Sequence, residues 1–350
     1  MKNYTHNLRF ISAIILFGML LLQQCNKESC EYIPTIDPPA DVNCKMTNTL
    51  NLSTGVDTNG NLLAPGKGIV DPFWKLLNIP PLISCSSPLL PTINGNVYVV
   101  NFSSAGNTGW VNQPTASTLA PLDLGTTDSF GCDNAINSQG QRVPYIFERP
   151  FCVLNSTTVD FNFTFRGDDQ IYFELINNNT NTVVNTSTLY TFPQATATWA
   201  ATSVSLPAGS YSIKAYLVNT SSVVTGFSFA GNLTTSKGDL SISNNALGCC
   251  ENNTISILNI KDENCNGIYN PTDIIGSGVT FNLKNSSGTI IATGVTNING
   301  NLFFSGLPNG TYTVTMVPQP GWAPSTPAGG ITTFALTNNV VKIINFYSCP

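Results

Sequence analysis

Residues 262–273 read Asp262-Glu263-Asn264-Cys265-Asn266-Gly267-Ile268-Tyr269-Asn270-Pro271-Thr272-Asp273. Oxygen-bearing side chains stand at positions 1, 3, 5, 9 and 12 of this stretch, and a glycine stands at position 6. This is the ligand spacing of a twelve-residue calcium loop, in which position 7 contributes its backbone carbonyl. The predicted Ca²⁺ ligands are therefore Asp262, Asn264, Asn266, Ile268, Asn270 and Asp273.

The residues before the loop indicate the fold that carries it. Residues 255–260 read Ile-Ser-Ile-Leu-Asn-Ile and alternate like a β-strand rather than a helix. We therefore expect the loop to brace a β-sandwich. Position 12 is Asp273 instead of the longer Glu, and positions 3, 5 and 9 are neutral, so we expect weak binding, with a Kd of roughly 0.1–1 mM. The alternative is an Asn-rich turn without metal.

Composition narrows the class of protein. The 350 residues suffice for two domains, and only 9% of them are charged, against roughly 25% in an average soluble domain. The single histidine, His6, lies in a segment that we expect to be removed. The mature chain then has no histidine for Ser/His/Asp or Cys/His catalysis. Ten cysteines suit an oxidising compartment, where disulfides persist.

The amino terminus has the pattern of a secretory signal. Lys2 and Arg9 precede an apolar run over residues 11–22, which is short for a membrane span of about 20 residues. The run ends before Cys25 and resembles a bacterial lipoprotein signal, although Gln24 replaces the usual small residue. We expect residues 1–24 to be a lipoprotein signal peptide and Cys25 to be lipidated, which places the protein on the cell surface as an outer-membrane lipoprotein.

The alternative is a secreted, extracellular protein in which Cys25 forms a disulfide. Lipidation of Cys25 leaves nine cysteines, so that one must stay unpaired, whereas all ten can pair without it. Removal of residues 1–24 takes away two basic and no acidic residues, which changes the net charge from −5 to −7. No basic patch then remains to favour nucleic acid as a partner.

The mature chain divides into a tether and two β-rich units. Residues 25–45 contain three prolines among polar residues and are predicted to be the tether. Residues 46–248 form the larger unit, and its clearest strand spans 158–165, where three phenylalanines alternate with polar residues. Short strands between turn signals favour a jelly-roll-like sandwich. Further strands are expected over 170–175, 199–206 and 211–218.

The smaller unit spans residues 253–350. Its predicted strands cover 279–283, 290–295, 302–304, 312–317 and 340–347. Both units carry one turn-then-strand motif, Leu-Pro-Ala-Gly-Ser-Tyr-Ser-Ile at 206–213 and Leu-Pro-Asn-Gly-Thr-Tyr-Thr-Val at 307–314. Proline and glycine make the turn, and the tyrosine and the β-branched residue point to one face of the strand.

The smaller unit resembles the SdrD B-like domain of serine–aspartate-repeat adhesins and the related Cna-B fold. The resemblance rests on the 262–267 loop and on segments 278–283, 296–307 and 310–314. It implies a prealbumin-like sandwich that spaces or stiffens a surface protein. It also implies that the first and last strands run parallel, which brings Cys265 and Cys349 to the same end, and we predict that they form a disulfide.

The larger unit resembles galactose-binding-like sandwiches of secreted bacterial proteins. The matching segments are 53–60, 71–74, 145–149 and 165–173 together with the region of Trp110. The resemblance implies glycan binding, with Trp74, Trp110, Asp168 and Asp169 as candidate ligand-binding residues. The alternative for each tryptophan is a place in the hydrophobic core.

Two sharper hypotheses concern the acidic residues. Arg166-Gly167-Asp168 spells an integrin-binding tripeptide and is expected in an exposed turn. Glu148, Asp168, Asp169 and Glu174 could form a glycosidase pair, which needs carboxyls roughly 5–5.5 Å or 6.5–9.5 Å apart. No motif sets such a separation here, and no phosphate-binding or nucleophile motif is present in the sequence.

The sequence as a whole predicts an all-β, non-enzymatic, surface-anchored lipoprotein of two β-sandwich domains, a jelly-roll-like one followed by a prealbumin-like one. Adhesion or matrix interaction is the first functional hypothesis. The expected partners are an extracellular glycan or matrix protein, and the outer membrane through the lipid anchor. The alternatives are a carbohydrate-binding module of a glycan-capturing system and a purely structural spacer.

Overall fold

The computed structural model describes residues 46–83, 95–101, 113–123, 133–192, 196–220, 225–242, 253–270, 272–337 and 340–350. Regular structure in these residues is β-strand, apart from the short 3-10 helix η1 (Ala328–Gly330). The predicted all-β fold class is confirmed. Within the same residues, no helix has the length and apolar character needed to cross a membrane. The predicted signal peptide (1–24), the tether with Cys25, and Trp110 lie outside the described residues.

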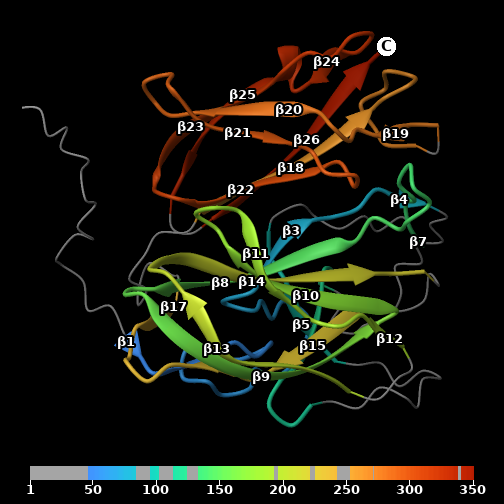
Figure 1. Cartoon of the computed structure of the whole chain (residues 1–350). Coiled ribbons are helices and arrows are strands. Elements are labelled where there is room, and N and C mark those ends of the chain that lie inside the picture. Colours follow the sequence, from blue (N-terminus) through green and yellow to red (C-terminus); the bar gives the residue numbers. More distant parts are fainter. Residues whose placement is uncertain are drawn as a thin grey trace, which may run out of the picture. The chain divides into compact units, whose positions relative to one another are not determined.

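The larger sandwich contains two main sheets (Figure 1). In the described residues the first sheet has eight strands. Six of them follow one another in the order β1 (Met46–Thr47), β17 (Leu240–Ile242), β8 (Tyr145–Val153), β14 (Gly209–Val218), β10 (Gln170–Asn177) and β11 (Thr182–Thr186). The other two are β3 (Lys75–Asn78), which pairs with β8, and β12 (Tyr190–Thr191), which pairs with β10. The second has seven strands, ordered β2 (Thr49–Asn51), β16 (Asn232–Thr234), β9 (Thr157–Asp168), β15 (Gly226–Ala230), β6 (Thr118–Ala120) and β5 (Tyr98–Val100), with β13 (Ala197–Leu206) beside β9. β4 (Leu82–Ile83) and β7 (Asp133–Asn134) form a separate two-stranded antiparallel sheet.

Aromatic side chains fill the space between the two sheets. Phe161, Phe163 and Phe165 of β9 are buried, whereas the residues between them face outward, as the alternation predicts. Phe173 of the first sheet lies 4.6 Å from Phe229 of the second, measured between ring centroids. The apolar residues of β10 and β14 point into the same core, so the intervening residues of these strands form the outer face of the first sheet.

The smaller sandwich also has two sheets. One consists of β19 (Ile274–Ile275), β18 (Asn253–Lys261), β26 (Val341–Cys349) and β24 (Ala323–Thr326), and β22 (Asn301–Leu307) pairs with β18 on the same edge as β19, opposite β26. The other consists of β21 (Ile290–Val295), β20 (Thr280–Lys284), β23 (Gly310–Met316) and β25 (Ile331–Leu336). Phe281 and Phe346 pack between the sheets with their ring centroids 4.8 Å apart. This core is separate from that of the larger sandwich.

The first and last strands of the smaller sandwich run side by side and parallel, as the resemblance implied. Their register runs from Thr254 opposite Val341 to Lys261 opposite Ser348. The strand ends therefore bring Cys265 and Cys349 together, with their Cα atoms 5.4 Å apart, and the predicted disulfide joins them.

The shared turn-then-strand motif makes one contact twice. The Tyr211 hydroxyl donates a hydrogen bond to the Pro207 carbonyl at 2.8 Å, and the Tyr312 hydroxyl donates to the Pro308 carbonyl at 2.9 Å. Both tyrosine rings are buried, each in the core of its own sandwich. In each unit a single side chain thus fixes the turn and fills the core.

Many hairpin ends use one polar turn, which occurs at four places in the described residues. Its first residue is Asp57, Asn137, Asn285 or Asn297. In each case the side-chain oxygen Oδ1 accepts the backbone N–H groups two and four residues later. The residue three positions on is a glycine with φ between +72° and +84°, a conformation that disfavours other residues. Three of these turns are built by an asparagine side-chain amide, and the fourth is built by the carboxylate of Asp57.

The described residues belong to one compact unit, in which the two sandwiches contact one another. The Thr254 hydroxyl donates to Glu148 Oε2 at 3.2 Å, and Lys214 Nζ lies 4.4 Å from the Phe303 ring centroid. Lys214 also lies 4.0 Å from Glu148 Oε1, and both side chains are about 1% exposed. Burial lowers the pKa of Lys214, an effect that the negative charges of Glu148 and Glu174 oppose. The division at residues 248/253 stays a prediction.

The disulfide generates a stability prediction. Replacement of both Cys265 and Cys349 by Ser should lower the free energy of unfolding by about 2–5 kcal/mol, because the bond closes a long stretch of chain. Their sequence separation is 84 residues. Urea denaturation of the full chain under oxidising conditions measures the change. The two single variants serve as controls and should resemble the double variant; a double variant as stable as the wild type would contradict the prediction.

Candidate functional site

The 262–273 loop follows β18 at the end of the parallel strand pair. The side chain of Asp262 is fully buried, and its carboxylate accepts the backbone N–H groups of Asn266 at 3.2 Å and Gly267 at 2.7 Å. Asn264 Oδ1 accepts the same Asn266 N–H at 3.1 Å. The side-chain oxygens of Asp262 and Asn264 therefore converge on one backbone group, at the amino-terminal half of the loop.

The carboxyl-terminal half of the loop folds back on the first half. Asp273 is 8% exposed, and its two carboxylate oxygens accept the backbone N–H groups of Glu263 at 3.1 Å and Asn270 at 2.8 Å. Burial raises the pKa of Tyr347, and the charges of Asp262 and Asp273 add to the rise. Both carboxylates thus raise the pKa of the same tyrosine, and the two buried carboxylates, Asp262 and Asp273, are called the acidic centre of the loop.

The residues fit a hard divalent cation in one respect and depart from the predicted ligand set in another. Neither Asp262 nor Asp273 has an ion pair with any described residue, although both are buried. Burial of a charged carboxylate is costly, the backbone N–H groups offset part of that cost, and a bound cation would offset more. By contrast, the Asn270 amide donates to the Ile268 carbonyl at 3.2 Å, so these two predicted ligands are bonded to each other. In the described part of the chain, no three acidic, cysteine or histidine side chains gather as a metal site.

Trp74 is not a surface residue, so its assignment as a sugar-stacking residue is wrong. Its side chain is fully buried, and its ring lies 5.4 Å from that of Phe227. The indole N–H donates to the Leu52 carbonyl at 3.3 Å. The physical reason lies in the turn before it: the Asp71 carboxylate accepts the Trp74 backbone N–H at 2.8 Å and directs the ring inward. The core alternative holds.

The Arg166-Gly167-Asp168 tripeptide is also placed differently from the prediction. It lies inside β9 and pairs with β15, and no exposed turn separates the strands there. Gly167 is buried, and a Cβ atom there would approach Ile171 Cγ2 to within 2.5 Å. Asp168 is only 3% exposed. The glycine thus serves close packing, and the tripeptide is not displayed in an exposed turn, because Gly167 and Asp168 are buried and only Arg166 is partly exposed.

Asp168 and Asp169 form an acidic pair at the end of β9. Burial raises the pKa of Asp168 to about 8, and a hydrogen bond to Asp169 and its negative charge add to the rise. The Asp169 carboxylate accepts the Thr220 hydroxyl at 2.7 Å. Glu148 and Glu174 lie elsewhere, on the outer face of the first sheet, on either side of Lys214. The buried Asp168 is therefore not the exposed ligand-binding acid that the sequence suggested.

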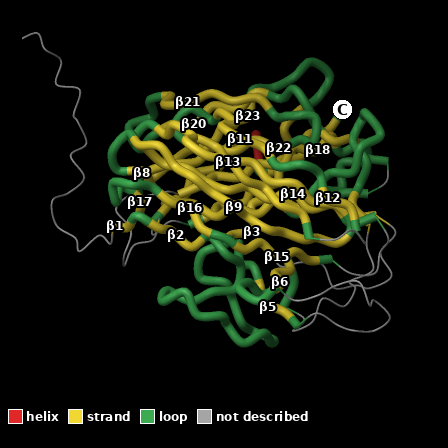
Figure 2. Tube along the Cα trace, turned by 60° about the horizontal axis from the view of Figure 1, so that its bottom comes forward, coloured by secondary structure: helices red, strands yellow, loops and turns green. Residues whose placement is uncertain are grey.

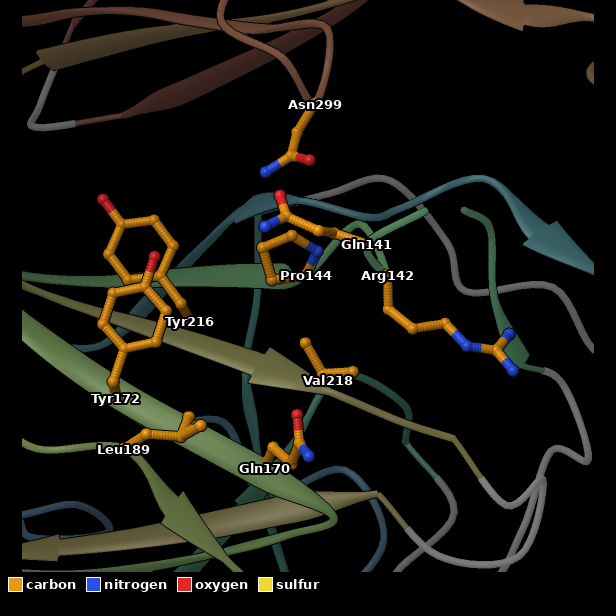
Figure 3. A pocket seen from close by; sticks show the side chains of 9 residues that line it. All are labelled: Gln141, Arg142, Pro144, Gln170, Tyr172, Leu189, Tyr216, Val218 and Asn299. Atoms are coloured by element: carbon orange, nitrogen blue, oxygen red, sulfur yellow. The ribbon is translucent and has the colours of Figure 1, made fainter. Parts of the chain in front are cut away.

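An open groove that the sequence did not predict lies on the outer face of the first sheet (Figure 3). Its volume is about 370 Å³. Tyr172 and Tyr216 form one wall, and they stand directly opposite each other on β10 and β14. Sequence offers a partial signal, because each tyrosine alternates with core residues and so points outward. The register that pairs them is visible only in the structure.

The acidic pair generates a prediction about pH. Asp168 binds its proton more tightly in the folded chain than its ordinary pKa of 3.8 allows, so the free energy of unfolding should fall as pH rises from about 4 to about 8. Asp168→Asn cannot lose a proton and should gain stability relative to the wild type across this range. Urea midpoints of both chains at pH 5 and pH 8.5 measure the difference. Equal pH slopes would contradict the assignment.

Comparison with solved structures finds pilins and a carbohydrate binding module. The chain is similar to GBS52, the minor pilin of the gram-positive pathogen Streptococcus agalactiae, with 14% identity, a TM-score of 0.24, and coverage of 55% of this chain and 84% of that chain. It is similar to the group B streptococcus pilus 2b backbone protein, with 9% identity, a TM-score of 0.22, and coverage of 62% and 95%. It is also similar to a family 35 carbohydrate binding module from an environmental isolate, with 11% identity, a TM-score of 0.23, and coverage of 49% and 97%.

Comparison at the level of sequence concerns the smaller sandwich. None of the curated proteins compared with the chain matches it. Residues 257–335 match the family model of the SdrD B-like domain. The match begins within β18, ends within β25 and includes the whole 262–273 loop. The predicted resemblance is therefore confirmed for residues 257–335, which are similar to the SdrD B-like domain.

Proposed function

We propose that this chain is a non-enzymatic lipoprotein of the bacterial cell surface that acts by adhesion or matrix contact. The observation that carries the proposal is the SdrD B-like match over residues 257–335, which supports a structural protein at the cell surface or outside the cell. The disulfide between Cys265 and Cys349 adds support, because such bonds persist in oxidising compartments. The larger sandwich would present the surface that meets the partner.

Carbohydrate binding is the second candidate function. The groove beside Tyr172 and Tyr216 favours it, because half-buried aromatic rings at an open groove suit the apolar faces of sugar rings. In this role the protein would serve a glycan-capturing system. The two candidates differ in the chemistry of the partner, not in the place of the protein at the surface.

We also propose that the 262–273 loop holds Ca²⁺ as a structural brace. Two buried carboxylates without an ion pair among the described residues support the proposal, as does the convergence of Asp262 and Asn264. Bound Ca²⁺ would supply a positive charge that holds the two halves of the loop together. The expected effect of bound Ca²⁺ is on the stability of the smaller sandwich, because the loop directly follows β18 at one end of its sheet.

The anchoring claim predicts a change in location. Cys25→Ser should move the chain from the membrane fraction to the medium, because the residue that carries the lipid is lost. Cys30→Ser, five residues along, is the matched control and should stay in the membrane fraction. Fractionation and mass spectrometry of the mature amino terminus measure both. A Cys25→Ser chain that stays membrane-bound would contradict lipid anchoring at this residue.

The calcium claim predicts a shift in melting. Addition of 5 mM CaCl₂ to the metal-free full chain should stabilise it by about 1–2 kcal/mol, given a Kd of roughly 0.1–1 mM, and raise the melting midpoint by a few degrees. Asp262→Asn keeps the shape of the side chain, removes its charge and should abolish the shift.

Asp57→Asn is the matched control, because it changes an acidic turn residue outside the loop. It should retain the calcium response of the wild type. Identical midpoints for the wild-type chain in CaCl₂ and in chelator would exclude calcium bracing, whatever the variants do.

A further inference from the structure

We propose that the groove on the outer face of the first sheet binds a neutral oligosaccharide. The inference rests on the second candidate function and assigns it a place and a ligand class. The lining residues include Gln141, Arg142, Gln170, Tyr172, Tyr216 and Asn299. The volume of about 370 Å³ lies at the lower end of the range for small-ligand sites, which suits one or two sugar rings.

The aromatic wall of the groove is held in place before any ligand arrives. The rings of Tyr172 and Tyr216 are stacked, with centroids 4.6 Å apart and planes 6° from parallel. The Tyr216 hydroxyl donates a 2.7 Å hydrogen bond to Glu174 Oε2, which fixes that ring. Both tyrosines are half-buried. Because little side-chain freedom remains to be lost, a ligand that packs on this wall binds at a low entropic cost.

The polar lining matches hydroxyl groups. Gln141, Gln170 and Asn299 bring side-chain amides to the groove from separate segments, and Figure 3 shows them around the same space as the tyrosine pair. An amide offers both donors and an acceptor, and a sugar hydroxyl also does both. Leu189, which is 56% exposed, adds apolar surface at the rim. Apolar ring faces beside amides are the combination that recognises a saccharide.

The charge of the groove excludes a strongly ionic ligand. Arg142 is its one lining residue with a charged side chain, and its guanidinium pairs with Asp133 at 3.2 Å and donates to the Asn134 carbonyl at 2.6 Å. The charge of Arg142 is thus already balanced by the protein. An anionic polysaccharide or phosphate would find no unpaired cation in the lining, which is why the proposed ligand is neutral.

Two turns shape the opposite side of the groove. Gln141 closes the turn that begins at Asn137, and Asn299 belongs to the turn that begins at Asn297. The Asn137 amide donates to Asn299 Oδ1 at 2.7 Å, which joins the turns across the two sandwiches. The amide-bearing side of the groove is therefore as ordered as the aromatic wall, and the site is built before binding.

The test titrates the full chain with cellohexaose, xylohexaose, mannohexaose and laminarihexaose by calorimetry, up to 10 mM. Saturable binding of at least one hexasaccharide is expected. Tyr172→Ala should weaken it at least tenfold through loss of the aromatic wall, and Gln170→Ala should weaken it severalfold through loss of one amide. Leu62→Ala, in a separate groove, is the control and should bind like the wild type.

Melting curves establish that each variant is folded, and Gln170→Ala decides the outcome if Tyr172→Ala does not fold. The proposal is overturned if no hexasaccharide saturates, or if folded groove variants bind like the wild type. It is also overturned if a proline-rich peptide, and no saccharide, binds in a Tyr172-dependent way. Calcium and anchoring have separate readouts in melting and fractionation, so failure here leaves those claims intact.

Discussion

The parallel pairing of β18 and β26 is the constraint on which the smaller sandwich depends. Parallel neighbours cannot be joined by a tight turn, so the chain between the first and last strands must return from one end of the sandwich to the other. Once they pair, the register places Cys349 beside Cys265 and brings the end of β18 into the 262–273 loop. The disulfide and the acidic centre therefore share one end of the sheet, and both report on whether the sandwich has closed.

The contact between the two sandwiches is chemically specific. Glu148 and Lys214 are neighbours on adjacent strands and are almost fully buried. Removing charged groups from water is costly unless they are paired and hydrogen-bonded, and Thr254 of the smaller sandwich supplies one such bond. Phe303 covers the ammonium group of Lys214. If the smaller sandwich packed against the larger one in another orientation, Glu148 and Lys214 would lose their contacts with Thr254 and Phe303. These contacts therefore favour one arrangement of the two sandwiches over others.

The sequence predicted strands best where periodicity was strong and long-range register did not matter. The alternating phenylalanines of β9 and the paired tyrosine motifs were read correctly from local pattern alone. Trp74 and the 166–168 tripeptide were misplaced, because an inward-directing turn and a packing glycine look like loop signals in sequence. In the 262–273 loop, where calcium binding stays a prediction, spacing could not reveal that Asn270 bonds to Ile268. The groove requires the pairing of Tyr172 with Tyr216, which no local pattern encodes.

The asparagine-based turns bear on the range of pH and salt in which the chain keeps its structure. Amide side chains do not titrate, and their hydrogen bonds to backbone N–H groups involve no formal charge. Three of the four turns begin with asparagine, and the fourth begins with Asp57, whose pKa is lowered chiefly by its bonds to Asn61. The shape of the three asparagine-based hairpin tips is therefore insulated from acidity and ionic strength, which suits a molecule that meets an environment the cell does not buffer.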